Sequence, residues 1–196
     1  MFMPRITLAA LALTLCRMAA ADTLTGQIDD PSIRRKADLV YVEQTDVKAP
    51  PAAKMVMGQH GNTYQPHVLA VVAGTTVTFK SDDPELHNIF ARLVKRVLFN
   101  EAVLPAGHFE KLFKEQGVVH LTCNIHKEMS AYVVVLQNGF FVAPDKKTGA
   151  FLINGLPPGT YTVRVWGEAL SDEQNARKYT ITIGGPRVAP LHVATL

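Results

Sequence analysis

Three residues that can bind a soft metal ion share one short stretch, residues 121–135, which reads LTCNIHKEMSAYVVV. Cys123, His126 and Met129 follow the spacing C-x2-H-x2-M and bring a thiolate, an imidazole and a thioether together. This set of nitrogen and sulfur ligands suits copper better than magnesium or calcium, which prefer oxygen. Copper sites of the electron-transfer type use two histidines, one cysteine and a weak axial methionine. The fourth ligand must come from upstream, and His87 in DDPELHNIF is the obvious candidate.

The context of these residues favours a metal site over the alternatives. Buried cysteine and methionine are ordinary core residues, and an isolated C-x2-H pair is weak evidence. Here, however, the apolar strand GVVHLTC ends at Cys123 and the strand SAYVVVL begins just after Met129, which places the ligands on a turn between two strands. A catalytic zinc site would need an open position and a nearby base. A c-type haem would need C-x-x-C-H, which the sequence lacks.

The N-terminus has the features of a secretory leader. Arg5 precedes an apolar run at residues 6–15, and an A-x-A pattern ends at Ala21. We therefore expect residues 1–21 to be a cleaved signal peptide and the mature protein to be periplasmic. The apolar run is too short for a permanent membrane span, so we expect no stable membrane insertion.

The composition excludes several classes of function. The chain is 47% hydrophobic and 19% charged, which is typical of a folded globular protein. Loss of residues 1–21 removes Arg5 and Arg17 and no acid, which leaves 18 basic against 17 acidic residues. Nucleic-acid binding would require a concentrated basic face, so we expect none. The sequence has no G-x-S-x-G or H-E-x-x-H motif, and we expect no enzymatic activity.

Short alternating strands separated by turns predict an all-β protein. Strands are expected at residues 24–28, 37–44, 54–59, 67–72, 75–80, 109–114, 117–122 and 130–136, with further strands after residue 138. In residues 91–108, the stretch ARLVKRVLF fits either a helical turn or a strand. His120 lies three residues before Cys123, and odd offsets along a strand point to opposite faces, so His120 should face away from the metal. His60 and His67 flank a loop and are expected at the surface.

Several motifs together resemble the cupredoxins, the blue-copper Greek-key β-sandwich proteins, over residues 54–137. They are AGTTVTFKSDD, LHNIF, FEKLF, GVVHLTCNIHKEM and AYVVV. The short C-x2-H-x2-M loop resembles that of amicyanin. The resemblance implies one copper ion on His87, Cys123, His126 and Met129, with Asn88 bracing the ligand loop through hydrogen bonds. It also implies a carrier of single electrons between redox partner proteins; the alternative is a copper-binding module for storage, delivery or recruitment. The segment 92–104 follows no cupredoxin pattern.

The remainder of the chain resembles a second family. From Asn138 onward, the pattern D-x2-TGAF-x-I-x-GLPPGTY-x-V resembles the carboxypeptidase regulatory-like, or transthyretin-like, β-sandwich domain. Together with the leader and the cupredoxin-like region, it resembles periplasmic proteins of the methylamine-utilisation-like type. We expect Tyr161 and Trp166 in a core or an interface, and Glu168 and Asp172 as solvated loop acids.

The order of the motifs predicts an insertion. The regulatory-like family begins with a G-x-I strand and an A-x-V-x-V strand, and these patterns stand at residues 25–28 and 37–44. Residues 138–196 alone give about four strands, too few to cover both faces of such a sandwich. We therefore expect residues 22–48 to fold with residues 138–196, with the cupredoxin domain, residues 54–137, inserted between them. The alternative is that residues 22–48 form the first cupredoxin strands.

Overall fold

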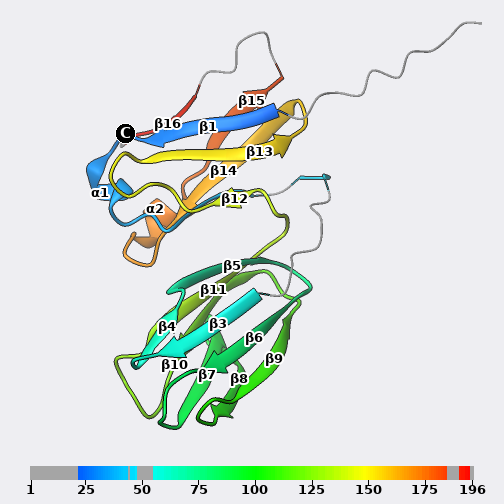
Figure 1. The fold of residues 1–196 in the computed structure, drawn as a ribbon. Helices are drawn as coiled ribbons and strands as arrows, with labels where there is room; N and C mark the ends of the chain where they lie inside the picture. The colour runs from blue at the N-terminus through cyan, green and yellow to red at the C-terminus, as the bar shows by residue number, and fades with distance from the viewer. Residues whose placement is uncertain (1–21, 44, 48–54, 185–189, 195–196) are drawn as a thin grey trace, which may run out of the picture.

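The protein is almost entirely β and forms two β-sandwiches (Figure 1). This computed structural model describes residues 22–43, 45–47, 55–184 and 190–194, so the expected signal peptide and Gln44, Lys48 and the linker up to residue 54 lie outside the described residues. The all-β fold class predicted from the alternating strands is confirmed. Within the described ranges, no helix is both long and apolar enough to cross a membrane.

The upper sandwich in Figure 1, here called the terminal sandwich, combines the first and last described parts of the chain. One sheet has the strand order β13-β1-β16 and the other β12-β2-β14-β15. The elements are β1 (Asp22–Ile28), α1 (Pro31–Arg34), β2 (Leu39–Val42), β12 (Phe141–Val142), β13 (Ala150–Leu156), β14 (Gly159–Trp166), α2 (Asp172–Ala176), β15 (Tyr179–Ile183) and β16 (Leu191–Val193). Strand β2 runs antiparallel to β14, with Val42 opposite Val163 and Leu39 opposite Trp166. Residues 39–42 therefore pair with the sheet that holds residues 161–166.

The lower sandwich, here called the central sandwich, contains a five-stranded sheet and a four-stranded sheet. Their strand orders are β5-β11-β10-β7-β8 and β4-β3-β6-β9. The strands are β3 (Met55–His60), β4 (Thr63–Gln65), β5 (Val68–Val72), β6 (Thr75–Ser81), β7 (His87–Leu93), β8 (Arg96–Val103), β9 (His108–Phe113), β10 (Gly117–Thr122) and β11 (Ser130–Leu136). Strands β5 and β11 are parallel, as are β3 and β6, and the other pairs are antiparallel.

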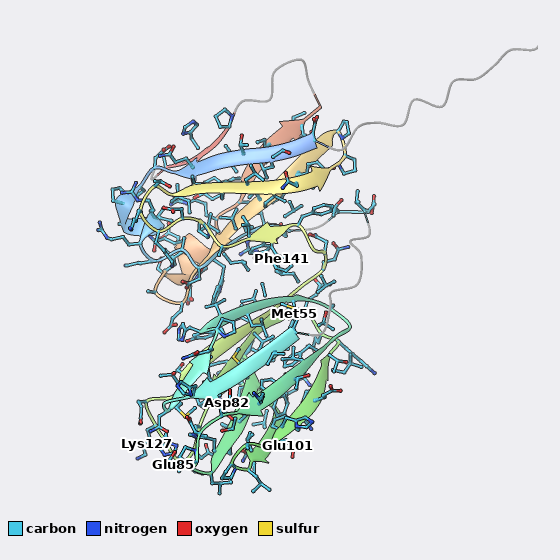
Figure 2. The ribbon with its side chains drawn as sticks, in the orientation of Figure 1. Met55, Asp82, Glu85, Glu101, Lys127 and Phe141 are labelled. Atoms are coloured by element: carbon cyan, nitrogen blue, oxygen red, sulfur yellow. The ribbon has the colours of Figure 1, made fainter. Side chains whose placement is uncertain are left out.

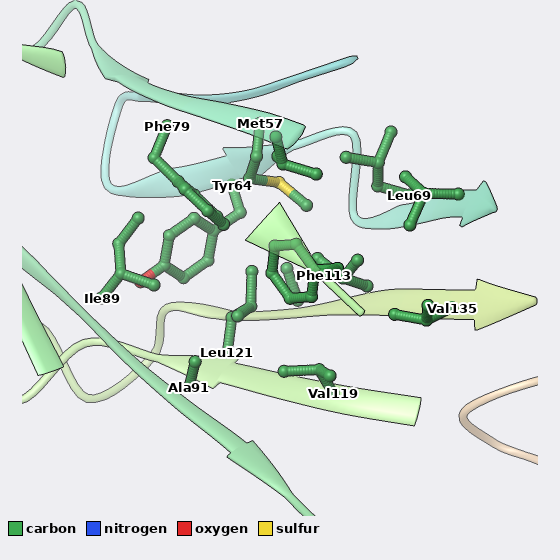
Figure 3. Close-up of a cluster of buried hydrophobic side chains, with 14 of the residues drawn as sticks. Met57, Tyr64, Leu69, Phe79, Ile89, Ala91, Phe113, Val119, Leu121 and Val135 are labelled. Carbon is green, nitrogen blue, oxygen red and sulfur yellow. The ribbon is translucent and has the colours of Figure 1, made fainter. Parts of the chain in front are cut away.

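The core of the central sandwich lies between its two sheets (Figure 3). Met57 and Phe79 point inward from the four-stranded sheet and face Ile89 and Leu121 of the five-stranded sheet. Strand β7 alternates strictly between buried and half-buried positions, as expected for a strand with one face on a core. The same core cluster contains Cys123 and Met129, so the metal-binding loop is continuous with it.

A separate apolar cluster joins the two sandwiches. This interface cluster has as its buried members Leu39, Ala70, Val134, Leu136 and Trp166. Strand β11 contributes to it with one face and to the core of the central sandwich with the other. A strand buried on both faces reads as a nearly continuous apolar run, which explains the sequence SAYVVVL. The prediction that Trp166 belongs to a core or an interface is therefore confirmed.

Several local features differ from the sequence-based expectations. The undecided stretch in residues 91–108 is a strand, since β7 and β8 form a hairpin. The loop expected between residues 59 and 67 contains the short strand β4. Between the strands expected at residues 24–28 and 37–44 lies the short helix α1, where the Asp30 side chain accepts a hydrogen bond from the Ser32 amide. Such N-caps stabilise even a single helical turn.

Candidate metal centre

Three of the four predicted ligands converge at one end of the central sandwich. The ligand atoms of His87, Cys123 and His126 all lie within 4.8 Å of one another. His87 is the first residue of β7 and is fully buried, whereas Cys123 and His126 lie on the loop that joins β10 to β11. Among the described residues, this is the one His, Cys, Asp and Glu cluster that could hold a metal ion. Met129 follows on the same loop, and both Met129 and Cys123 are buried members of the same core cluster.

Two hydrogen bonds within the ligand loop keep it compact. The Met129 amide donates to the His126 carbonyl at 3.1 Å, and the His126 amide donates to the Cys123 sulfur at 3.5 Å. An N–H group directed at the sulfur stabilises a thiolate, the form of cysteine that binds metals. The loop therefore holds its sulfur and nitrogen ligands in one compact turn.

Asn88, the residue expected to brace this loop, contacts it directly. Its Oδ1 accepts a hydrogen bond from the Asn124 amide at 2.7 Å and lies 3.4 Å from the Cys123 thiol. Its Nδ2 donates to Asn100 Oδ1 at 2.6 Å, which fixes the orientation of the amide. Asn100 belongs to β8, the strand that follows no recognised pattern. No sequence signal pointed to Asn100, because it acts only through the β7–β8 pairing.

His87 is held from its far side by a carboxylate that the sequence analysis did not single out. The Asp83 Oδ2 atom lies 2.9 Å from His87 Nε2, while His87 Nδ1 lies 3.0 Å from His126 Nδ1. Asp83 also accepts hydrogen bonds from the amides of Gly61 and Asn62 at 2.6 and 3.2 Å. Burial by itself raises the pKa of the Asp83 carboxyl, but these amides and the His87 ring outweigh it, so its pKa lies below the ordinary value.

Other residues beside the site have structural roles. Tyr64 is buried, which raises its pKa, and its hydroxyl donates to the Asn88 carbonyl at 3.2 Å. His120 faces away from the ligands, as predicted: it stacks on Tyr132 with ring centroids 4.8 Å apart and lies within hydrogen-bonding distance of Ser130. His60 is exposed, as expected.

His67 and Glu168 are both exposed, as expected, and they also contact each other. His67 is exposed over about half of its side chain, but its Nε2 pairs with the Glu168 carboxylate across the junction of the two sandwiches. Glu168 is an exposed loop acid, as expected, and this pairing with His67 adds to that role. The two residues are 101 positions apart, so no local pattern could have paired them.

The metal-binding end of the central sandwich lies away from the terminal sandwich. In Figure 2, Glu85 and Lys127, which are near His87 and His126 in the sequence, lie together at the end of the central sandwich opposite Phe141 of the terminal sandwich. Ile125, between Cys123 and His126, is half-exposed, and His126 is partly exposed. Solvent therefore reaches this end of the central sandwich at His126.

The residues present fit a soft metal ion. The two imidazole Nδ1 atoms are 3.0 Å apart, close enough for one ion at a usual metal–nitrogen distance of about 2.0 Å to contact both. The sulfur donor is buried and is the one cysteine in the described residues, so it has no disulfide partner there. Two imidazoles, a thiolate and the thioether of Met129 on the same loop form a ligand set typical of copper rather than of cations that prefer oxygen.

About half of the chain is similar in structure to solved cupredoxins. No family model and no curated protein sequence matches it. The purple cupredoxin from Nitrosopumilus maritimus is 30% identical, with a TM-score of 0.37; the match covers 43% of this chain and 99% of that one. Amicyanin from Paracoccus versutus is 22% identical, with a TM-score of 0.39, over 49% of this chain and 96% of that one. The copper-containing nitrite reductase of Thermus scotoductus SA-01 is 21% identical, with a TM-score of 0.40, over 48% of this chain and 25% of that one.

Proposed function

We propose that this protein binds one copper ion through His87, Cys123, His126 and Met129 and carries single electrons between redox partner proteins in the periplasm. The observation that supports this most directly is the convergence of two imidazole nitrogens and one buried sulfur within 4.8 Å at one end of a β-sandwich. When bound, copper supplies a one-electron couple between Cu(I) and Cu(II). Cys123 binds as a thiolate, and Met129 serves as the weak axial ligand that helps to set the potential.

The surroundings of the site suit electron transfer better than chemistry on a substrate. His87 and Cys123 are anchored by adjacent strands of one sheet, so the donor atoms need to move little when the charge of the ion changes. His126 is partly exposed at the free end of the sandwich, where a partner protein can approach closely. Electron tunnelling weakens steeply with distance, so such an edge is the natural place for exchange. The proposal assigns no catalytic residue.

The terminal sandwich serves as a scaffold in this proposal. Its strand pairing agrees with a carboxypeptidase regulatory-like domain built from residues 22–48 and 138–196, with the cupredoxin domain, residues 54–137, inserted. Its attachment to the outer face of β5 and β11 leaves the ligand end uncovered. We assign the whole chain to the methylamine-utilisation-like group of periplasmic proteins on the motifs described above.

Copper titration of residues 22–196 tests the proposal. We expect one equivalent of Cu(II) to give an intense visible thiolate-to-copper band, and Cys123→Ser to abolish it. Met129→Leu should keep the band and raise the reduction potential, because a weak donor to Cu(II) is lost. Met57→Leu is the matched control, since Met57 is another buried methionine of the same core cluster. A colourless protein that prefers Cu(I) would favour storage or delivery, and a native spectrum in Cys123→Ser would refute the ligand assignment.

A further inference from the structure

A buried carboxylate contacts the side of His87 that faces away from the other ligands. Asp83 is 5% exposed, and its Oδ2 atom lies 2.9 Å from His87 Nε2. His87 itself is fully buried, so no solvent competes for this contact. A carboxylate accepts hydrogen bonds and has no proton to donate, so the shared proton belongs to His87 Nε2. The lone pair of the imidazole is then on Nδ1, the atom that faces His126 at 3.0 Å.

Asp83 is itself held rigidly. Its Oδ1 accepts from the Gly61 amide at 2.6 Å and its Oδ2 from the Asn62 amide at 3.2 Å. Both amides belong to the turn between β3 and β4, where Gly61 and Asn62 have φ angles of 59° and 56°. Two successive residues in the left-handed region direct their N–H groups to one side, a geometry suited to binding an anion. The turn thus fixes the carboxylate, and the carboxylate fixes the imidazole.

We propose that Asp83 is a positioning residue for the metal centre: it holds His87 as the Nε2–H tautomer and, by its charge, favours the oxidised ion and lowers the reduction potential. The effect on the reduction potential rests on the proposed function, whereas the role in holding the His87 tautomer does not. A negative charge hydrogen-bonded to a ligating imidazole makes that ligand more basic, which stabilises the higher charge of Cu(II) more than that of Cu(I). Loss of such partners typically reduces metal affinity about 10- to 100-fold.

The neighbouring aspartate provides a matched control. Asp82 precedes Asp83 in the chain, but its side chain is half-exposed and pairs with Lys80 at 2.6 Å (Figure 2). Asp82→Asn removes the same charge from almost the same place without touching His87. Asp83→Asn removes the charge but keeps one amide oxygen as an acceptor, so it disturbs the turn less than Asp83→Ala would.

The first measurement is the reduction potential of the copper-loaded proteins. We expect Asp83→Asn to lower the affinity for Cu(II) at least tenfold more than that for Cu(I), which corresponds to a rise of about 59 mV in potential for a one-electron couple. Asp82→Asn should change the reduction potential by only a small fraction of that shift. Equal shifts in both variants, or no shift in either, would overturn the assignment of the charge effect to the contact with His87.

The second measurement separates this inference from the proposed function. ¹⁵N NMR of the metal-free wild-type protein reports directly which ring nitrogen of His87 carries the proton. We expect the Nε2–H tautomer in wild type and in Asp82→Asn, and its loss or mixing with the Nδ1–H form in Asp83→Asn. If wild type forms no copper–thiolate band, the proposed function fails, while this spectrum still decides the positioning role. A His87 ring protonated at Nδ1 in wild type would refute that role.

Discussion

Replacement of Trp166 by alanine should weaken the attachment of the two sandwiches. Trp166 is the last residue of β14 and is 8% exposed. Its indole packs in the interface cluster with Ala70 and Val134 of the central sandwich and meets the Tyr132 ring edge-on, with centroids 5.5 Å apart. The two chain connections between the sandwiches remain in the variant, so the substitution isolates the packing contribution.

The size of the effect follows from the buried area. A buried aromatic side chain removes about 150–250 Å² from water, and about 25 cal/mol per Å² gives roughly 4–6 kcal/mol for complete burial. Alanine retains a part of that, and Trp→Ala changes in cores cost about 3–5 kcal/mol. For Trp166→Ala we expect a loss of about 3 kcal/mol in the free energy of unfolding. In a chain of this length, that corresponds to a fall of about 6–12 °C in the melting temperature.

Scanning calorimetry of residues 22–196 provides the test. Leu152→Ala is the control, because Leu152 lies on β13 of the same sandwich and is 48% exposed on the side away from the interface cluster. The control should cost less than about 1 kcal/mol. Trp166→Ala should also accelerate hydrogen exchange at β5 and β11, the two strands that contact the terminal sandwich. A melting temperature lowered no more than in Leu152→Ala would show that the interface cluster contributes little to stability.

Two further predictions concern single positions. Val94 begins the turn between β7 and β8 and is 86% exposed, with a φ angle of 54° at which a β-branched residue is strained. Val94→Gly should therefore raise the free energy of unfolding, measured by urea denaturation, by about 1 kcal/mol. The control Lys95→Gly, at the next position of the same turn, should lower the free energy of unfolding. Burial lowers the pKa of His120, so the unfolded chain binds a proton more readily than the folded one, and stability falls as the pH drops below about 6.5. His120→Gln should flatten this dependence between pH 7 and pH 5, and an unchanged slope would contradict it.

The ligand loop could be found from the sequence because its signal is local. The three loop ligands lie within one turn, and the flanking strands are readable from their apolar runs. His87 was predicted because a copper site of the electron-transfer type needs a second histidine from an upstream strand, and His87 stands in the cupredoxin-like stretch LHNIF. Strand β7 then places His87 beside the loop, since β7 and β10 are neighbours in the sheet.

The supporting residues could not be found in the same way, because each depends on a long-range contact. Asp82 and Asp83 look alike in the sequence SDDP, yet one is solvated and the other is buried by the turn between β3 and β4. Asn100 belongs to β8, which is exposed or half-buried at every position except the last. An edge strand with little burial carries no alternating pattern, which is why residues 91–108 allowed both a helical and a strand interpretation.

The metal centre consequently depends on the relation between the two sheets of the central sandwich. His87 and Cys123 belong to the five-stranded sheet, or to the loop that leaves it, whereas the amides that hold Asp83 belong to the four-stranded sheet. The orientation of the His87 ring therefore depends on how the two sheets pack against each other. The core residues around Phe79 and Leu121 determine that packing (Figure 3). Because close-packed cores transmit small shifts, a substitution that moves one sheet over the other alters the Asp83–His87 contact without touching a ligand. The C-x2-H-x2-M loop thus specifies which atoms bind, and the sandwich specifies where the fourth ligand points.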